Sequence, residues 1–86
     1  MASYNLLIKP SAAKELEAAP KKDRERLAIG IKGLAANPRL PGSEKLSGEE
    51  KHRVRQGDYR ILYLIDDASG TVSVVKIGHR REVYRH

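Results

Sequence analysis

The sequence predicts an α+β domain in which an N-terminal strand and two helices precede an antiparallel three-strand meander, with all strands in one sheet packed on the helices. Two observations support this fold class. Apolar side chains recur at helical spacing in residues 10–36, whereas from residue 51 they alternate with polar ones, as in strands. Residues typical of turns separate these runs. No repeat or linker divides the chain, so residues 1–86 are expected to form one domain.

The first half is predicted to contain one strand and two helices. Residues 4–8 form a short apolar run that indicates a strand. Pro10 suits the first turn of a helix and Ser11 can cap it, which indicates a short helix ending before Pro20. A second helix is expected over residues 23–36. Its apolar residues fall at helical spacing, at Leu27, Ile31 and Leu34.

Two glycines lie inside this second helix. Each is expected to cost about 1 kcal/mol relative to Ala in a helix interior. No strand–glycine–helix pattern precedes Gly30 and Gly33, so they are not expected to bind phosphate. We expect them instead to allow close packing of two elements.

The second half is predicted to be a loop and then three strands. The loop covers residues 37–48, which are rich in Pro and Gly. The strands are expected over residues 52–56, 59–65 and 71–77. A two-residue turn, Gly followed by Asp, connects the first two strands. The segment Asp-Asp-Ala-Ser-Gly at residues 66–70 connects the last two.

The composition narrows the classes of partner and chemistry. The chain has 17 Lys and Arg against 11 Asp and Glu, a formal charge of +6 and a pI of 9.8, which favours a polyanionic partner. It has no Cys, which excludes disulfides, thiolate metal sites and a Cys nucleophile. No apolar run is long enough to span a bilayer and the N-terminus does not resemble a signal peptide. We therefore expect a cytoplasmic protein with no membrane partner.

A basic face is predicted on the central strands. Alternation places Lys51, Arg53 and Arg55 on one face, and the hairpin brings Arg60 near them. Clustered guanidinium groups repel one another unless an anion is present, and the planar fork of Arg suits phosphate. The alternative is a solvated edge whose charges prevent strand addition. The tail adds a second polar and basic cluster at His79, Arg80, Arg81, Tyr84 and Arg85.

Such residues suit metal-free cleavage of RNA. The chain has no paired carboxylates in a basic setting and no metal-ligand spacing, so no metal or other cofactor is expected. The 2′-hydroxyl of RNA is an internal nucleophile once it is deprotonated. Arginines can stabilise the extra charge on the phosphorane, and Tyr, Lys or His can transfer protons.

Three segments resemble the RelE/ParE toxin superfamily, and the resemblance covers nearly the whole chain. The segments are Lys45-Leu46-Ser47-Gly48, Arg53-Val54-Arg55-x-Gly57-Asp58-Tyr59-Arg60-Ile61-Leu62-Tyr63 and Val75-x-Ile77-Gly78-His79-Arg80-x-x-Val83-Tyr84. The resemblance implies a toxin of a type II toxin–antitoxin system that cleaves mRNA in the ribosomal A site and inhibits translation. It also implies a cognate antitoxin as partner, beside the ribosome and mRNA.

The resemblance also implies roles for individual residues. Arg60 and Arg80 would stabilise the transition state, and Tyr84 would transfer a proton or stack on the substrate. Arg53 and Arg55 would activate the 2′-hydroxyl or bind phosphate. Further contacts with RNA or the ribosome are expected from Lys51, His52, Arg81 and Arg85.

The general base stays open at this point. Some RelE toxins have Lys where this chain has Arg53 and Arg55, and Arg is a poor base because it stays protonated. Tyr84, His52 or Lys51 would then take the proton. His79 is a further alternative, although a structural role is expected for it because it sits next to the strand end. A ParE-like inhibitor of DNA gyrase without nuclease activity is the competing function, and a non-toxic binding module that retains only the basic face is a third.

Overall fold

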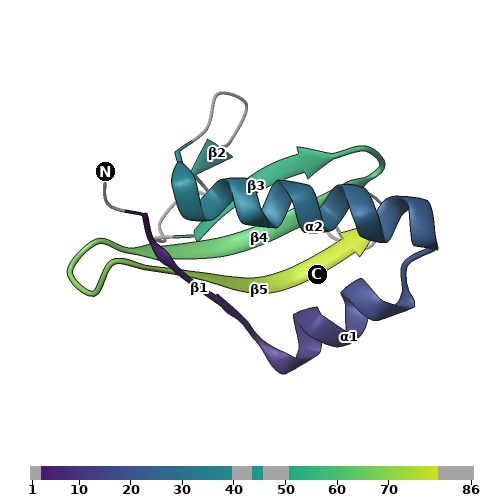
Figure 1. The fold of residues 1–86 in the computed structure, drawn as a ribbon, viewed down its shortest axis with the longest axis horizontal. Helices are drawn as coiled ribbons and strands as arrows, with labels where there is room; N and C mark the ends of the chain where they lie inside the picture. Colours follow the sequence, from purple (N-terminus) through teal and green to yellow (C-terminus); the bar gives the residue numbers. More distant parts are fainter. Residues whose placement is uncertain (1–2, 40–43, 46–50, 80–86) are drawn as a thin grey trace.

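The computed structural model describes residues 3–39, 44–45 and 51–79. Both helices lie on one side of a five-stranded sheet of order β1-β5-β4-β3-β2 (Figure 1). The elements are β1 (Asn5–Ile8), α1 (Pro10–Ala18), α2 (Lys21–Ala36), β2 (Glu44–Lys45), β3 (Lys51–Gln56), β4 (Tyr59–Asp66) and β5 (Thr71–His79). The predicted α+β class is confirmed, as is the order of a strand, two helices and a meander.

The sheet is mixed, which corrects the expectation of a strictly antiparallel one. The meander β3–β4–β5 is antiparallel, but β1 pairs in parallel with β5, from Asn5 opposite Thr71 to Ile8 opposite Val74. The two helices return the chain to the starting end of the sheet before the meander begins. Since β5 runs in the same direction as β1, the first and last strands become parallel neighbours.

A second correction concerns the predicted loop at residues 37–48. The two residues of β2 lie in this segment and pair antiparallel with β3, with Glu44 opposite Arg53. A two-residue strand gives no alternation of side chains, so periodicity does not detect it.

Prolines set the limits of the helices. Pro10 opens α1, where the missing N–H has no intrahelical partner to lose. Pro20 separates the two helices, and Lys21 begins α2 two residues earlier than expected. At the other end the N–H of Asn37 bonds to the carbonyl of Gly33, and Pro38 stops the helix.

The core lies between the helices and the facing side of the sheet. Its buried residues include Leu27, Ile31 and Leu34 of α2, Ile61, Tyr63 and Ile65 of β4, and Val72, Val74 and Ile77 of β5. The predicted helix face is therefore confirmed. Tyr63 is the largest fully buried side chain, and its hydroxyl donates to the carbonyl of Pro38 at 2.6 Å. This bond fixes the chain where it leaves α2.

A β-bulge changes the register of β5 halfway along its length. Tyr63 pairs with Val74, whereas its neighbour Leu62 pairs with Lys76, so β5 carries one extra residue. Because of the bulge, the side chain of Ile77 points into the core. The bulge also places Gly78 opposite Arg60 at the far end of the strand.

The two glycines of α2 behave differently. A Cβ on Gly30 would lie 2.9 Å from the side-chain oxygen of Gln56 in β3, whereas one on Gly33 would meet nothing within 4 Å. The expectation of close packing is confirmed at Gly30 and wrong at Gly33.

Candidate nucleic-acid interface

The hairpin of β3 and β4 builds the candidate site. Its two-residue turn is flanked by Gln56 and Tyr59, and Gly57 has a φ of +62°, which only glycine adopts without strain. A positive φ at this first central position, followed by an ordinary one at Asp58, is the pattern of a type II′ turn. The turn therefore fixes which residues of the two strands lie opposite each other.

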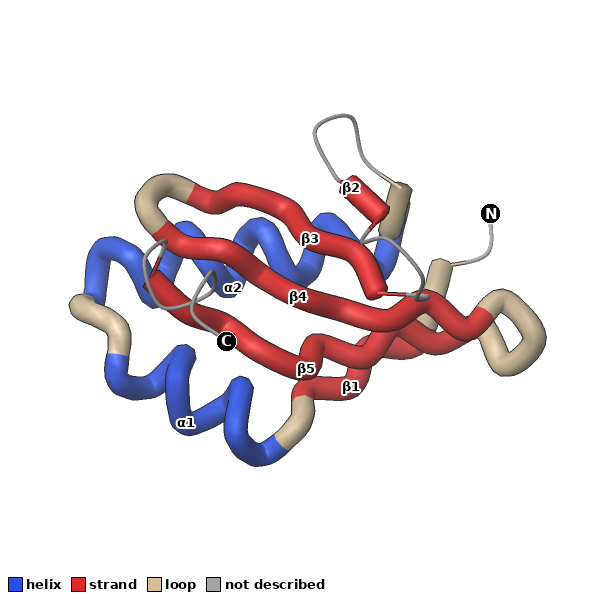
Figure 2. The backbone as a smooth tube through the Cα atoms, turned by 180° about the vertical axis from the view of Figure 1, so that it is seen from behind, coloured by secondary structure: helices blue, strands red, loops and turns tan. Residues whose placement is uncertain are grey.

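The register brings four cations together on the face of the sheet turned away from the helices. Arg55 lies directly opposite Arg60. Arg53 and Lys51 follow on the same face of β3, opposite Leu62 and Leu64. Figure 2 shows this face of the sheet, with α2 behind it. We name these four residues, Lys51, Arg53, Arg55 and Arg60, the basic face.

Of the basic face, Arg55 and Arg60 lie closest to the hairpin turn. Next to a two-residue turn they form a non-hydrogen-bonded pair, in which the two Cα atoms lie only about 4.5 Å apart. Arg55 is exposed, whereas only 4% of the surface of Arg60 is exposed, and its Nη1 donates to the carbonyl of Tyr59 at 3.4 Å. Two neighbouring guanidinium groups match the charge and geometry of a phosphate.

His52 lies outside the basic face, and its expected role in RNA binding stays a prediction. Its side chain points to the helix side of β3, where only 7% of the surface of His52 is exposed. Its ring stacks on Tyr63, with centroids 5.5 Å apart and an interplanar angle of 20°. The alternation of β3 causes this placement, since His52 lies between Lys51 and Arg53 in the sequence.

The tail residues expected to complete the site, Arg80, Arg81, Tyr84 and Arg85, lie outside the described residues. Their roles stay predictions. The last described residue is His79, which pairs with Tyr59 beside the hairpin turn. The chain therefore leaves β5 at the same end of the sheet as Arg55 and Arg60.

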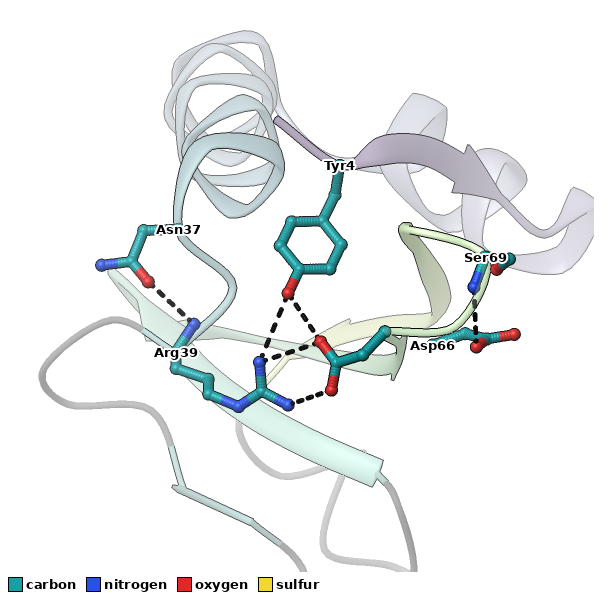
Figure 3. Close-up of polar contacts among 6 residues, drawn as sticks. Tyr4, Asn37, Arg39, Asp66 and Ser69 are labelled. Carbon is teal, nitrogen blue, oxygen red and sulfur yellow. Dashed lines mark hydrogen bonds and ion pairs between the residues drawn. The ribbon is translucent and has the colours of Figure 1, made fainter. Parts of the chain in front are cut away.

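A polar cluster at the opposite end of the sheet was not predicted. Arg39 holds the carboxylate of Asp67 with both terminal nitrogens, at 2.8 and 3.3 Å, and the Tyr4 hydroxyl donates to the same carboxylate at 2.6 Å (Figure 3). The hydrogen bond from Arg39, then that from Tyr4, lowers the pKa of Asp67 from its ordinary value of 3.8. The hydrogen bonds that Arg39 donates to Asp67 and, next, to the Tyr4 hydroxyl raise the pKa of Arg39.

This Tyr4–Arg39–Asp67 cluster joins three elements that are distant in the sequence. They are the start of β1, the exit of α2 and the β4–β5 turn. No spacing in the sequence relates the three residues, so only the folded arrangement reveals the cluster.

Within the described ranges, no group of three His, Asp or Glu side chains is placed to hold a metal ion. In the same part of the chain, no helix has the length and apolar character needed to cross a membrane.

Solved structures of toxins from toxin–antitoxin systems are similar to this fold. The toxin–antitoxin complex RelBE2 from Mycobacterium tuberculosis matches with a TM-score of 0.81 and 27% identity, over 92% of this chain and 100% of that chain. The isolated RelE toxin of E. coli matches with a TM-score of 0.80 and 28% identity, over 95% and 92% of the two chains. The archaeal RelE–RelB complex from Pyrococcus horikoshii matches with a TM-score of 0.80 and 25% identity, over 91% and 96%.

Sequence comparison identifies the family. Toxin RelE of Mycobacterium tuberculosis is 33% identical over 84 residues, which cover 95% of this chain and 87% of the relative. Residues 6–84 match the family model of the ParE toxin of type II toxin–antitoxin systems, parDE. The chain therefore belongs to the ParE toxin family, and its relatives make it a RelE-like toxin. The resemblance seen in the sequence is confirmed.

Proposed function

We propose that this RelE-like toxin is an endoribonuclease that cleaves mRNA in the ribosomal A site and thereby inhibits translation. The observation that carries the proposal is the direct opposition of Arg55 and Arg60, with Arg53 and Lys51 on the same face. Guanidinium groups bind phosphate through paired hydrogen bonds, so this concentration of cations on one face supports binding of the RNA backbone.

The basic face supplies what cleavage of RNA requires of a protein without a metal. The 2′-oxygen attacks the adjacent phosphorus, the bond to the 5′-oxygen breaks, and a 2′,3′-cyclic phosphate remains on the upstream fragment. Arg55 and Arg60 stabilise the added charge on the phosphorane, and Arg53 binds a neighbouring phosphate. A protein group must take the 2′ proton, and another must give one to the leaving 5′-oxygen.

The proton-transfer groups are part of the proposal. Lys51 lies half-buried on the basic face and is the described residue best placed to act as a base there. His52 is unsuited, because its ring stacks on Tyr63 in the core. Tyr84 and Arg80 keep the roles that the family resemblance implies, proton transfer or stacking and charge stabilisation.

The test is cleavage of a defined mRNA on programmed ribosomes, with the cut mapped by primer extension. We expect a cut in the A-site codon and a cyclic phosphate end. A 2′-deoxy nucleotide at the cut site should block the reaction. Intact mRNA in the presence of folded wild-type toxin would overturn the proposal.

Substitutions then locate the site. Arg55→Ala is expected to lower the single-turnover rate about a hundredfold, the usual loss when one donor to a developing charge is removed. Arg60→Ala and Tyr84→Ala are each expected to abolish detectable cleavage, with folding checked by circular dichroism. Lys32→Ala, on the exposed side of α2, is the matched control and should keep full activity. Full activity in the Arg55 and Arg60 variants would reject this site.

A second function has one observation in its favour. The matching family model is that of ParE toxins, so inhibition of DNA gyrase is the alternative activity. The same protein, added to a gyrase supercoiling assay, decides between the two. Inhibited supercoiling with intact mRNA would establish the alternative.

We also propose a cognate antitoxin and a cytoplasmic location. Matching structures from Mycobacterium tuberculosis and Pyrococcus horikoshii are complexes of a toxin with an antitoxin. The positive charge of this chain suits an acidic partner segment. Co-expression with the product of the neighbouring reading frame is expected to give a stable complex.

A further inference from the structure

A shallow depression of about 200 Å³ lies on the helix side of the sheet, at the same end as Arg55 and Arg60, between the end of α1 and the end of the β4–β5 pair. Glu15 and Ala18 of α1, with Ala19 directly after the helix, form one wall. Tyr59 and residues 77–79 form the other. The rings of Tyr59 and His79 meet edge to face, with centroids 5.6 Å apart and planes at 79°. The depression therefore offers aromatic surface on one side and small alanine side chains on the other.

The bulge in β5 connects this depression to the basic face. Because of the extra residue, Gly78 rather than a residue with a side chain lies opposite Arg60. Gly78 also lines the depression. Arg60 points to the other face of the sheet from the depression, and the backbone of Gly78 lies between the two. The pairing of β1 with β5 ends at Val74, so a nucleotide whose phosphate contacts Arg60 can pass its base around the edge of β5 at Gly78.

Polar groups at the edge of β5 give the depression a chemical preference. One oxygen of the Glu15 carboxylate accepts a hydrogen bond from the backbone N–H of Ile77 at 3.0 Å. The other oxygen accepts one from Lys76 Nζ at 2.9 Å. These contacts use one acceptor position on each oxygen, and a carboxylate has about four. Glu15 can therefore accept a further hydrogen bond from a ligand.

We propose that this depression is a nucleobase subsite for one nucleotide of the RNA substrate next to the cleaved phosphate. The volume suits one planar ring system, and the Tyr59 and His79 rings supply the surface on which a base packs. Glu15 accepts a hydrogen bond from the exocyclic amino group of adenine, cytosine or guanine. Uracil has no such group. The subsite thereby contributes to the choice of codon. The inference rests on the proposed function, because an RNA substrate brings the base to this place.

Binding is tested without any cleavage assay. The four nucleoside 5′-monophosphates are titrated into ¹⁵N-labelled full-length protein, and amide shifts are followed by NMR. We expect saturable shifts at Ala18, Ile77 and His79 with AMP, CMP and GMP, and binding of UMP several-fold weaker. His79→Ala should weaken binding of AMP about tenfold, since base–aromatic packing contributes on this scale. Ile29→Ala, exposed on α2, is the control and should leave binding unchanged.

The outcomes separate the subsite from the nuclease. Shifts confined to Arg53, Arg55 and Arg60 would mean that only the phosphate binds, and the subsite would be rejected. UMP binding as tightly as CMP would reject the role of Glu15. Glu15→Gln is the second variant, and it should narrow the difference between CMP and UMP because its amide can donate to a uracil carbonyl. Failure of the wild-type protein to cleave mRNA overturns the nuclease, while the titration still decides the subsite.

Discussion

Asp67 shows how one exposed residue joins distant parts of this chain. Its carboxylate accepts hydrogen bonds from Arg39 and Tyr4, which lie at the exit of α2 and the start of β1. Both contacts favour the charged form of Asp67 and lower its pKa. Because the folded pKa lies below the unfolded value, the charged carboxylate stabilises the fold above pH 3.8. That stabilisation is lost as the pH falls through the folded pKa.

The cluster predicts a difference in acid sensitivity. Asp67→Asn should lower the urea midpoint of unfolding at neutral pH, where the wild-type carboxylate is charged. The two midpoints should converge as the pH is lowered below 3.8. Tyr4→Phe removes one of the three hydrogen bonds that Asp67 accepts and should give a smaller change of the same sign. Midpoints that differ by the same amount at every pH would contradict this account.

Single residues of the basic face were predictable where strand alternation alone decides their direction. Alternation places Lys51, Arg53 and Arg55 together and His52 on the other side, and the structure has this arrangement. The expected contact of His52 with RNA stays a prediction. The burial of Arg60 was not predictable, because it depends on what packs over the strand and not on the strand itself.

At the scale of elements, the sequence indicates the bulge in β5 but does not define its partner strand. Val72 and Val74 alternate in phase, and Ile77 is out of phase with them. A change of phase within an apolar strand indicates an extra residue, but it does not say which partner strand accommodates it. The pairing of Gly78 with Arg60 and of His79 with Tyr59 follows from the bulge. The depression beside α1 was therefore not predictable from periodicity.

Helix α2 offers a paired test of glycine. Gly33→Ala is expected to raise the free energy of unfolding by about 0.5 to 1 kcal/mol, because Ala is a better helix former and its Cβ meets nothing within 4 Å. Gly30→Ala should gain less or lose stability, because its Cβ must displace Gln56. Chemical denaturation measures both.

A double variant separates the two contributions at Gly30. In a Gln56→Ala background, Gly30→Ala should recover most of the gain seen at Gly33. If it does not, the close approach of Gln56 is not what limits substitution at Gly30.

At the scale of the whole molecule, the α+β class and the order of elements were predictable, whereas the strand neighbours were not. Local spacing identifies the runs at Leu27, Ile31 and Leu34 and in the meander. The parallel pairing of β1 with β5 joins residues at opposite ends of the sequence, from Asn5 with Thr71 onward. No local pattern contains that information.

The placement of charge predicts how binding responds to salt. The basic face faces away from the helices, and α2 carries other exposed cations on the opposite side. If single-stranded RNA binds the basic face, each phosphate contact contributes about 0.7 to the slope of log K against log salt. Arg55→Ala should reduce the slope by about that amount, whereas Lys32→Ala should leave it unchanged. An RNA with 2′-O-methyl groups prevents cleavage during the measurement. Equal effects of the two substitutions would indicate that binding follows net charge and not this face.

The position of β5 in the sheet has a consequence for the timing of assembly. Synthesis delivers the strands in the order β1 to β5, yet in space β5 lies between β1 and β4. While β5 is still inside the ribosome that makes it, β1 has no hydrogen-bonding partner and one edge of β4 is bare. The sheet can close only after the final strand has emerged, since long-range pairings must wait for the chain that forms them. A nascent chain therefore completes this sheet, and the surroundings of Arg60 within it, only after β5 has been synthesised and has left the ribosome.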